Sequence, residues 1–286
     1  MRCFFVSDLH GRSRRYESLF RLIADERPAA VFLGGDLLPS GLRLRGADAD
    51  LPSNFIANVL MRSFEQLRER LRDEYPRVLL IPGNDDPRCH EPELREGEAR
   101  GLWDYVHGRR VTMGEWPVYG YACVSPTPFR LKDWERYDVS RHVEPGCIPP
   151  EEGIHTVPVA LSEVQHSTIR EDLDRLFGED DLSHAIGLIH GPPYQTYLDR
   201  AGLDGRMIDH VPMDVHVGSI ALRRFIEKRQ PLLTLHGHIH ESARITGHWR
   251  DRLGRTHLFS AAHDGPELAI VRFDPEKLDE ATREPS

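Results

Sequence analysis

Seven side chains in the sequence could bind metal ions, and each follows a short apolar segment. They lie in five clusters: Asp-Leu-His at 8–10, Gly-Asp at 35–36, Gly-Asn at 83–84, His-Gly at 190–191 and Gly-His-Ile-His at 237–240. Carboxylate, imidazole and amide ligands together suit Mn, Fe, Zn or Ni better than calcium. A carboxylate can bridge two ions, so this set can hold a pair. The expected metal ligands are Asp8, His10, Asp36, Asn84, His190, His238 and His240.

The apolar segments before these clusters read as buried strands of a parallel sheet. Segments with helical periodicity lie between the first three strands, and this alternation of strands and helices is typical of a parallel sheet with crossover helices. Ligands of open α/β sheets bind beyond the carboxyl ends of the strands. The five clusters are therefore expected to converge. The expected strands are 3–6, 30–33, 78–81, 118–124, 185–189, 232–235, 256–259 and 268–273, and the expected helices are 14–24, 55–71, 163–177 and 219–227.

Residues 125–161 have no clear periodicity and contain six prolines. A stretch of this length is expected to be a covering loop or lid over a single domain that spans residues 1–275. Its Phe129, Trp134 and Arg141 could stack on a base or sugar, or could seal the core beneath the loop. Residues 276–286 are expected to be a polar tail.

The composition narrows the function classes. The chain has 286 residues and a formal net charge of -9, which argues against general binding of nucleic-acid backbones. Its four cysteines form no close metal-binding pair and no disulfide framework. Because no apolar run is long enough to span a bilayer, we expect a cytoplasmic protein without membrane contact. The sequence is compatible with a homo-oligomer and does not decide the oligomeric state.

The five clusters, in this order, resemble the calcineurin-like metallophosphoesterase family. The block Gly-Asn-Asp-Asp-Pro at 83–87 and the run His-Ile-His-Glu-Ser at 238–242 also resemble a bacterial and archaeal subgroup of predicted phosphoesterases. The resemblance covers residues 8–240. It implies an α/β fold, a four-layer αββα sandwich of two mixed sheets flanked by helices. It also implies two divalent metal ions, with Mn²⁺ as the first expectation and Fe, Zn or Ni as alternatives.

The same resemblance divides the ligands between the two ions. It implies that Asp8, His10 and His240 hold the first ion, that Asp36 bridges, and that the second ion is bound by Asn84, His190 and His238. A hydroxide between the ions would attack the phosphorus of a small phosphoester substrate in line.

Asp85 is a departure from the family pattern, because most catalytic members carry a histidine directly after the asparagine. Two nearby dications keep a carboxylate ionised, so Asp85 is expected to be a poor proton donor, although it could orient water or reach a metal. The enzyme is therefore expected to favour phosphodiesters. The expected catalytic residues are Asp85, His190 and Asn84.

Several other residues have two interpretations. Arg12 and His263 are expected, with Asn84, to contact substrate, but both could be ordinary surface side chains. His236 is expected to be a buried histidine that supports the ligands. A second Asp-x-His at 214–216 follows no convincing strand, so we expect no metal there.

The leading prediction is a metal-dependent phosphodiesterase. A phosphomonoesterase, including a protein phosphatase, is the alternative within the same chemistry. A third hypothesis is a protein-interaction scaffold that binds metal without significant turnover.

Overall fold

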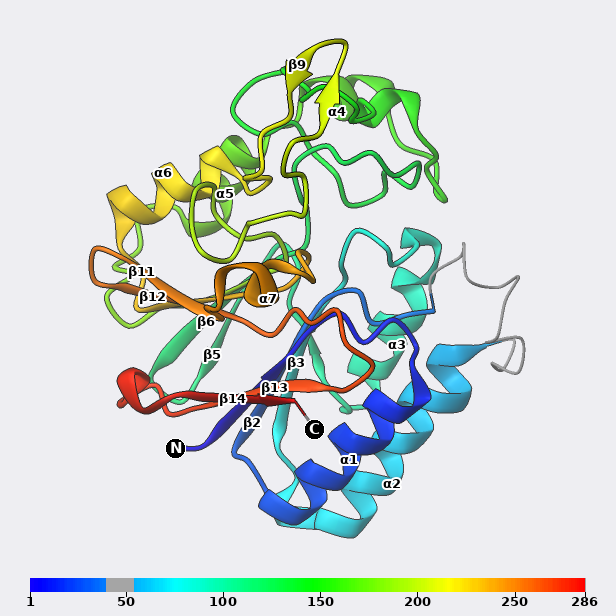
Figure 1. Cartoon of the computed structure of the whole chain (residues 1–286). Helices are drawn as coiled ribbons and strands as arrows, with labels where there is room; N and C mark the ends of the chain where they lie inside the picture. Colours follow the sequence, from blue (N-terminus) through cyan, green and yellow to red (C-terminus); the bar gives the residue numbers. More distant parts are fainter. Residues whose placement is uncertain (40–53, 286) are drawn as a thin grey trace.

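The computed structural model describes residues 1–39 and 54–285 and contains two packed six-stranded sheets (Figure 1). The first has the strand order β14-β13-β1-β2-β3-β4 and the second the order β11-β12-β10-β7-β6-β5. The strands of the first are β1 Cys3–Val6, β2 Ala30–Gly34, β3 Arg77–Ile81, β4 Asp104–Tyr105, β13 Ala269–Phe273 and β14 Thr282–Pro285. Those of the second are β5 Arg110–Met113, β6 Trp116–Tyr121, β7 Ile186–Ile189, β10 Leu233–His236, β11 Arg250–Leu253 and β12 Thr256–Ser260. Both sheets combine parallel and antiparallel pairs.

Helices cover the outer face of each sheet. The first sheet is covered by α1 Ser13–Glu26, the π-helical turn Ile56–Met61, α2 Arg62–Leu71 and α3 Glu91–Ala99. The second is covered by α5 Ile169–Phe177 and α6 Ile220–Arg229. The predicted four-layer αββα sandwich of two mixed sheets is confirmed.

The alternation of side chains along the strands explains these layers. In β1, Phe4 and Val6 belong to the apolar cluster beneath the helices, whereas Phe5 belongs to the cluster between the sheets. Successive strand residues point to opposite faces, so a strand buried on both sides must be apolar throughout. This is the reason that the buried strands could be recognised in the sequence.

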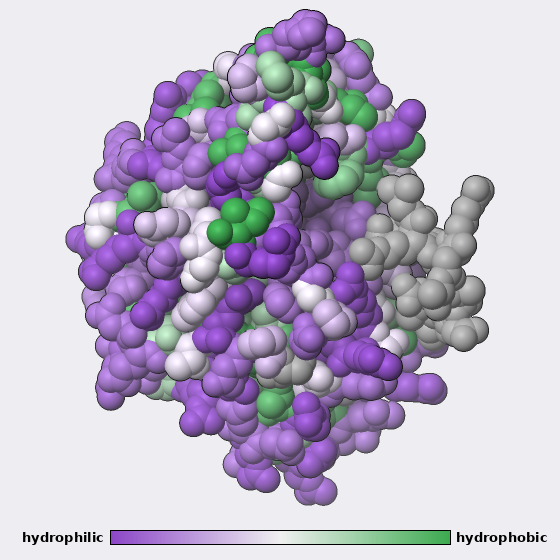
Figure 2. Space-filling view, viewed as in Figure 1, coloured by the Kyte–Doolittle hydropathy of each residue, from purple (hydrophilic) through white to green (hydrophobic). Residues whose placement is uncertain are grey.

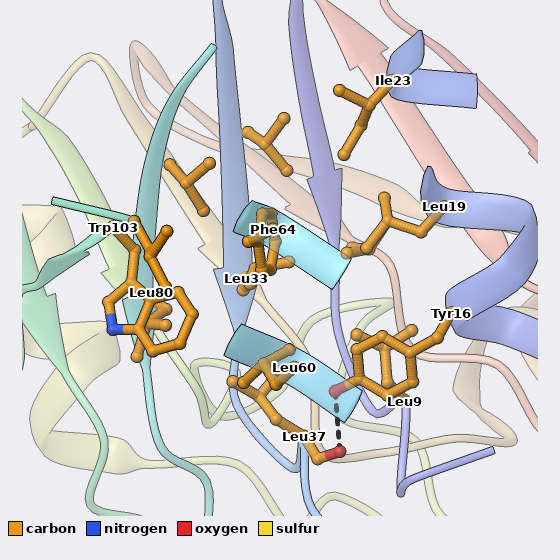
Figure 3. Packing of buried hydrophobic residues seen from close by; sticks show 14 of the residues in the cluster. Leu9, Tyr16, Leu19, Ile23, Leu33, Leu37, Leu60, Phe64, Leu80 and Trp103 are labelled. Carbon is orange, nitrogen blue, oxygen red and sulfur yellow. Dashed lines mark hydrogen bonds between the residues drawn. The ribbon is translucent and has the colours of Figure 1, made fainter. Parts of the chain in front are cut away.

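The core beneath α1 also fixes one of the loops that carry candidate ligands. Tyr16, Leu19 and Ile23 of α1 point toward Leu33 and other sheet residues (Figure 3). The Tyr16 hydroxyl donates a hydrogen bond to the carbonyl of Leu37, at 2.8 Å. Because Leu37 directly follows Asp36, this bond ties the helix to the loop after β2.

Some predicted elements differ from the structure. The helix expected over 163–177 is divided into α4 Leu161–His166 and α5, because the chain is extended at Ser167 and Thr168, and Thr168 caps α5. The strand expected over 118–124 ends at Tyr121. The described part of the expected polar tail, residues 276–285, does not form a free tail. They contain a 3-10 turn at Leu278–Glu280, and β14 pairs with β13 along its length.

The remaining elements are short and lie in the connections between the main helices and strands. They are the hairpin of β8 Met207–Ile208 and β9 Val211–Pro212, the short helix α7 Ser242–Thr246, and 3-10 turns at Arg72–Glu74, Arg88–His90 and Pro150–Glu152. Among the described residues, none of the helices combines the length and apolar character needed to cross a membrane.

Candidate metal centre

The ends of parallel strands bring the predicted ligands together. Asp8 and His10 follow β1, Asp36 follows β2 and Asn84 follows β3, and these three strands are parallel neighbours. His190 follows β7, and His238 and His240 follow β10, its parallel neighbour in the second sheet. The site therefore lies where the carboxyl ends of the parallel strands of both sheets come together.

Six of the seven predicted ligands form two groups that share Asp36. One group contains Asp8, His10, Asp36 and His240, and the other contains Asp36, His190 and His238. Within each group, one possible ligand atom from every residue lies within 4.8 Å of the others. Apart from Asn84, the two groups contain the residues that the family resemblance assigns to the two ions.

Atoms of the first group face one another in a way that suits a cation. The Nε2 atoms of His10 and His240 are 3.2 Å apart, and Nε2 of His240 is 3.2 Å from Oδ1 of Asp8. These nitrogen and oxygen atoms converge closely enough to bind one cation, and nitrogen with carboxylate oxygen is a common ligand set for Mn, Fe or Zn.

The second group includes Asn84 through its contact with His190. Nδ1 of His190 donates to the Gly34 carbonyl at 2.8 Å, which turns Nε2 toward Asn84 Oδ1 at 3.1 Å and Asp36 Oδ2 at 3.5 Å. A carbonyl partner that fixes the tautomer and orientation of a ring is a regular feature of metal-binding histidines. Asn84 thus lies beside the second group, and its role as a ligand stays a prediction.

The backbone at this site is strained. Asp8, His10, Asp36 and His238 all have positive φ, between 47° and 73°, a conformation that residues other than glycine rarely adopt. Such strain is concentrated at functional sites, where the surrounding structure compensates for it. Here it turns each side chain sharply off the end of its strand.

Close packing at a glycine keeps the ligands together. A Cβ atom on Gly83 would lie 2.3 Å from Asp36 Oδ1 and 2.7 Å from Cε1 of His190. The glycine of the Gly-Asn motif is therefore required by space, because any side chain would push into two candidate ligands.

The two central carboxylates stay ionised near neutral pH. Burial alone would raise the pKa of Asp36, but the neighbouring His190 and His10 outweigh it and lower that pKa to about 2. Burial likewise opposes ionisation of Asp8, and the hydrogen bond and charge of His240 lower its pKa far below the usual range. The site therefore presents fixed negative charge to a cation.

Asp85 lies beside the first group without belonging to it. Its Oδ2 is 3.2 Å from Nδ1 of His10, on the side of the ring away from His240. Its backbone N–H donates to Asp36 Oδ1 at 2.8 Å. Asp85 thus contacts two predicted ligands at once.

Two buried residues support the site but were not singled out from the sequence. Asp86 accepts hydrogen bonds from the backbone N–H groups of Leu37, Leu38 and Gly83, and so joins the loops after β2 and β3. The Arg15 guanidinium donates to the carbonyl of Asp8 and to that of Gly265, which connects the first ligand loop to the one after β12.

His236 has the role predicted for it. Its Nδ1 lies 2.9 Å from the Gly191 carbonyl, and its Nε2 lies 2.8 Å from the Thr234 hydroxyl. The fully buried ring is thus satisfied on both sides and holds the turn that follows His190.

The two predicted substrate residues outside the metal groups lie near one loop. Arg12 donates to the Gly265 carbonyl at 3.1 Å, and the His263 ring is 3.3 Å from Glu267. Their contact with substrate stays a prediction. In the second Asp-x-His, His216 bonds to the buried Asp199 at 2.8 Å instead of joining either metal group.

The covering segment is anchored next to the site. Trp134 is buried, and its Nε1 donates to the carbonyl of Asp86 at 2.7 Å, so this residue seals the core rather than offering a free stacking surface. Phe129 is 55% exposed, and Arg141 pairs with Glu151. Figure 2 shows a hydrophilic hollow below the part of the molecule that carries α4 and β9.

Comparisons with known proteins concern the family and the fold. The family model described as calcineurin-like phosphoesterase matches residues 1–242. One solved structure is similar with a TM-score of 0.61 and 16% identity over 99% of this chain and 98% of its own. The crystal structure of TT1561 of Thermus thermophilus is similar with a TM-score of 0.58 and 17% identity over the same shares. At these identities the structures show the fold alone. No curated protein sequence matches.

Proposed function

Because the chain belongs to the calcineurin-like phosphoesterase family, we propose that it hydrolyses small phosphodiesters at a centre of two divalent metal ions. The observation that carries the proposal is the sharing of Asp36 by two groups of converging ligands. In this assignment Asp8, His10 and His240 hold the first ion, and Asp36 bridges. The second ion is held by Asn84, His190 and His238.

Bound ions would lower the pKa of a coordinated water and neutralise charge on the phosphoryl oxygens. The protein supplies the arrangement. The Gly34 carbonyl orients His190, and Asp86 holds the loops of Asp36 and Asn84 at a fixed separation. Arg12, directly before α1, and His263, in the loop after β12, are proposed to contact the substrate. Mn²⁺ is the proposed metal, because the mixed oxygen and nitrogen ligands suit it, and Fe, Zn or Ni are the alternatives.

The preference for diesters rests on Asp85. Its carboxylate occupies the sequence position of the usual histidine and lies 3.2 Å from His10. An ionised carboxylate cannot protonate a leaving group. We therefore expect the enzyme to act on esters whose leaving groups depart without that help, and phosphodiesters with stable leaving groups are the proposed class.

The test compares bis(p-nitrophenyl) phosphate with p-nitrophenyl phosphate at equal Mn²⁺ loading. Both release the same leaving group, so the ratio of kcat/KM reports the ester class. A higher value for the diester is expected, and Asp36→Ala and His238→Ala should abolish both activities. A clear preference for the monoester would contradict the diester assignment.

The loss of the usual proton donor also favours a second candidate, a metal-binding scaffold without significant turnover. Full metal occupancy combined with no hydrolysis of diesters, monoesters or nucleotides would support it. A chain that binds no metal at any loading would contradict both candidates.

A further inference from the structure

The two nitrogens of His10 face different partners. Nε2 lies 3.2 Å from Nε2 of His240 and 3.7 Å from Asp36 Oδ2, within the first group of ligands. Nδ1, on the other side of the ring, lies 3.2 Å from Asp85 Oδ2. The side chain of His10 is 8% exposed and that of Asp85 is 28% exposed, so the carboxylate reaches solvent whereas the ring is largely buried.

The backbone fixes Asp85 at this place. Its N–H donates to Asp36 Oδ1 at 2.8 Å, which leaves Oδ2 of Asp36 to face His10 and His190. Asp85 is therefore attached to the shared carboxylate through its peptide and to His10 through its side chain. Asp85→Ala removes the second contact and keeps the first.

We propose that Asp85 is a positioning residue for His10. A carboxylate can only accept, so His10 protonated at Nδ1 places its lone pair at Nε2, toward the first cation site. Carboxylate partners of this kind orient metal-binding histidines and increase their basicity. The consequence for cations rests on the proposed function, whereas the effect on the His10 tautomer is a property of the chain itself.

The contact also gives a reason for an aspartate at this position. A histidine side chain would bring no fixed negative charge to His10. The aspartate contributes that charge beside the ligands of the first ion and should favour binding there over the second site. At position 85, the chain thus has a carboxylate that orients the metal ligand His10 in place of the usual proton-donating histidine.

The first experiment measures the tautomer of His10 in the metal-free protein. Histidine nitrogens are labelled with ¹⁵N, the His10 signals are assigned from a His10→Gln variant, and two-bond ¹H–¹⁵N spectra are recorded at alkaline pH. The Nδ1–H tautomer is expected in the unsubstituted protein and in Asp85→Asn, whose amide oxygen can accept the same proton. Asp85→Ala should shift His10 toward the other tautomer.

The second experiment titrates the metal-free proteins with Mn²⁺ in a calorimeter. Asp85→Ala should weaken one of the two sites by roughly ten- to a hundredfold, the usual effect of removing a carboxylate behind a ligand, and Asp85→Asn should recover part of this loss. Asp104→Ala is the matched control. Asp104 is 32% exposed and also forms an ion pair, with Arg77, but Arg77 begins β3 and lies at the strand end opposite Asn84.

An unchanged His10 tautomer in Asp85→Ala would overturn the proposal, as would Mn²⁺ affinities of that variant that equal those of the unsubstituted protein at both sites. If the unsubstituted protein binds no Mn²⁺, the proposed function fails, and the tautomer measurement still decides whether Asp85 positions His10. Thermal unfolding of each variant confirms that the comparison is made between folded proteins.

Discussion

Space around Gly83 is as important to the site as the ligands themselves. A methyl group there would lie 2.3 Å from Asp36 Oδ1, so Gly83→Ala must displace the shared carboxylate. We expect this variant to bind Mn²⁺ at least about tenfold more weakly in calorimetric titrations. Gly202→Ala is the control, because its nearest contacts are 3.8 Å away. Equal affinity of the two variants would show that the site tolerates the displacement.

The ligands could be predicted from the sequence because each directly follows a buried strand, and parallel strands end at a common edge. The supporting roles of Asp86 and Arg15 could not be predicted in this way. Asp86 accepts from Leu37 and Leu38, which precede it by almost fifty residues, and no local pattern marks that contact. The role of Asp85 also depended on seeing which side of His10 it faces.

The covering segment depends on a buried ion pair. Lys132 and Glu135 are both fully buried, and Lys132 Nζ donates to Glu135 Oε2 at 2.5 Å. Lys132→Met would leave the carboxylate buried without its partner, and we expect the free energy of unfolding to fall by about 3 kcal/mol.

Urea denaturation measures this effect. Adding Glu135→Gln to Lys132→Met should restore part of the stability, because Thr127 can still donate to the amide oxygen. If Lys132→Met alone unfolds at the same urea concentration as the unsubstituted protein, the pair does not stabilise the segment.

A partly buried histidine after β4, His107, makes stability depend on pH. His107 accepts a hydrogen bond from the Ala122 N–H, and burial lowers its pKa to about 4. In the unfolded chain, His107 binds a proton near pH 6.5, whereas in the folded chain it stays neutral down to about pH 4. The contribution of neutral His107 to the free energy of unfolding is therefore complete above about pH 6.5 and is lost as the pH falls toward 4.

His107→Gln keeps an acceptor but does not titrate. Its free energy of unfolding should therefore decrease less between pH 7 and pH 4.5 than that of the unsubstituted protein, as measured by urea denaturation at each pH. Parallel curves for the two proteins would contradict the assignment.

At the same scale, the central strands could be predicted and the edge strands could not. A strand buried on both faces is a continuous apolar run, such as Ile186–Ile189. The edge strands β11 and β14 are largely exposed, and their sequences, Arg-Asp-Arg-Leu and Thr-Arg-Glu-Pro, show no such run. Their pairing is decided by the neighbouring strand rather than by their own composition.

The carboxyl-terminal residues belong to the packed structure of the whole molecule. Leu278 and Ala281 are buried in the cluster between the sheets, and Arg283 donates to the Ala262 carbonyl at 2.6 Å. A chain truncated after residue 275 should lose about 2 kcal/mol or more of unfolding free energy, because the Leu278 side chain alone accounts for that amount. Denaturation midpoints test this, with Leu278→Ala in the full chain expected to reproduce part of the loss. Identical midpoints for the truncated and full chains would contradict it.

In the two packed sheets, the carboxyl ends of β1, β2, β7 and β10 bring their candidate ligands together, which leads to one central claim: the chain holds two metal ions that share Asp36. Anomalous diffraction from Mn²⁺-loaded crystals, recorded at the manganese absorption edge, tests it most directly. We predict two peaks, one among Asp8, His10, Asp36 and His240 and one among Asp36, His190 and His238. A single peak, or peaks away from these residues, would contradict the account.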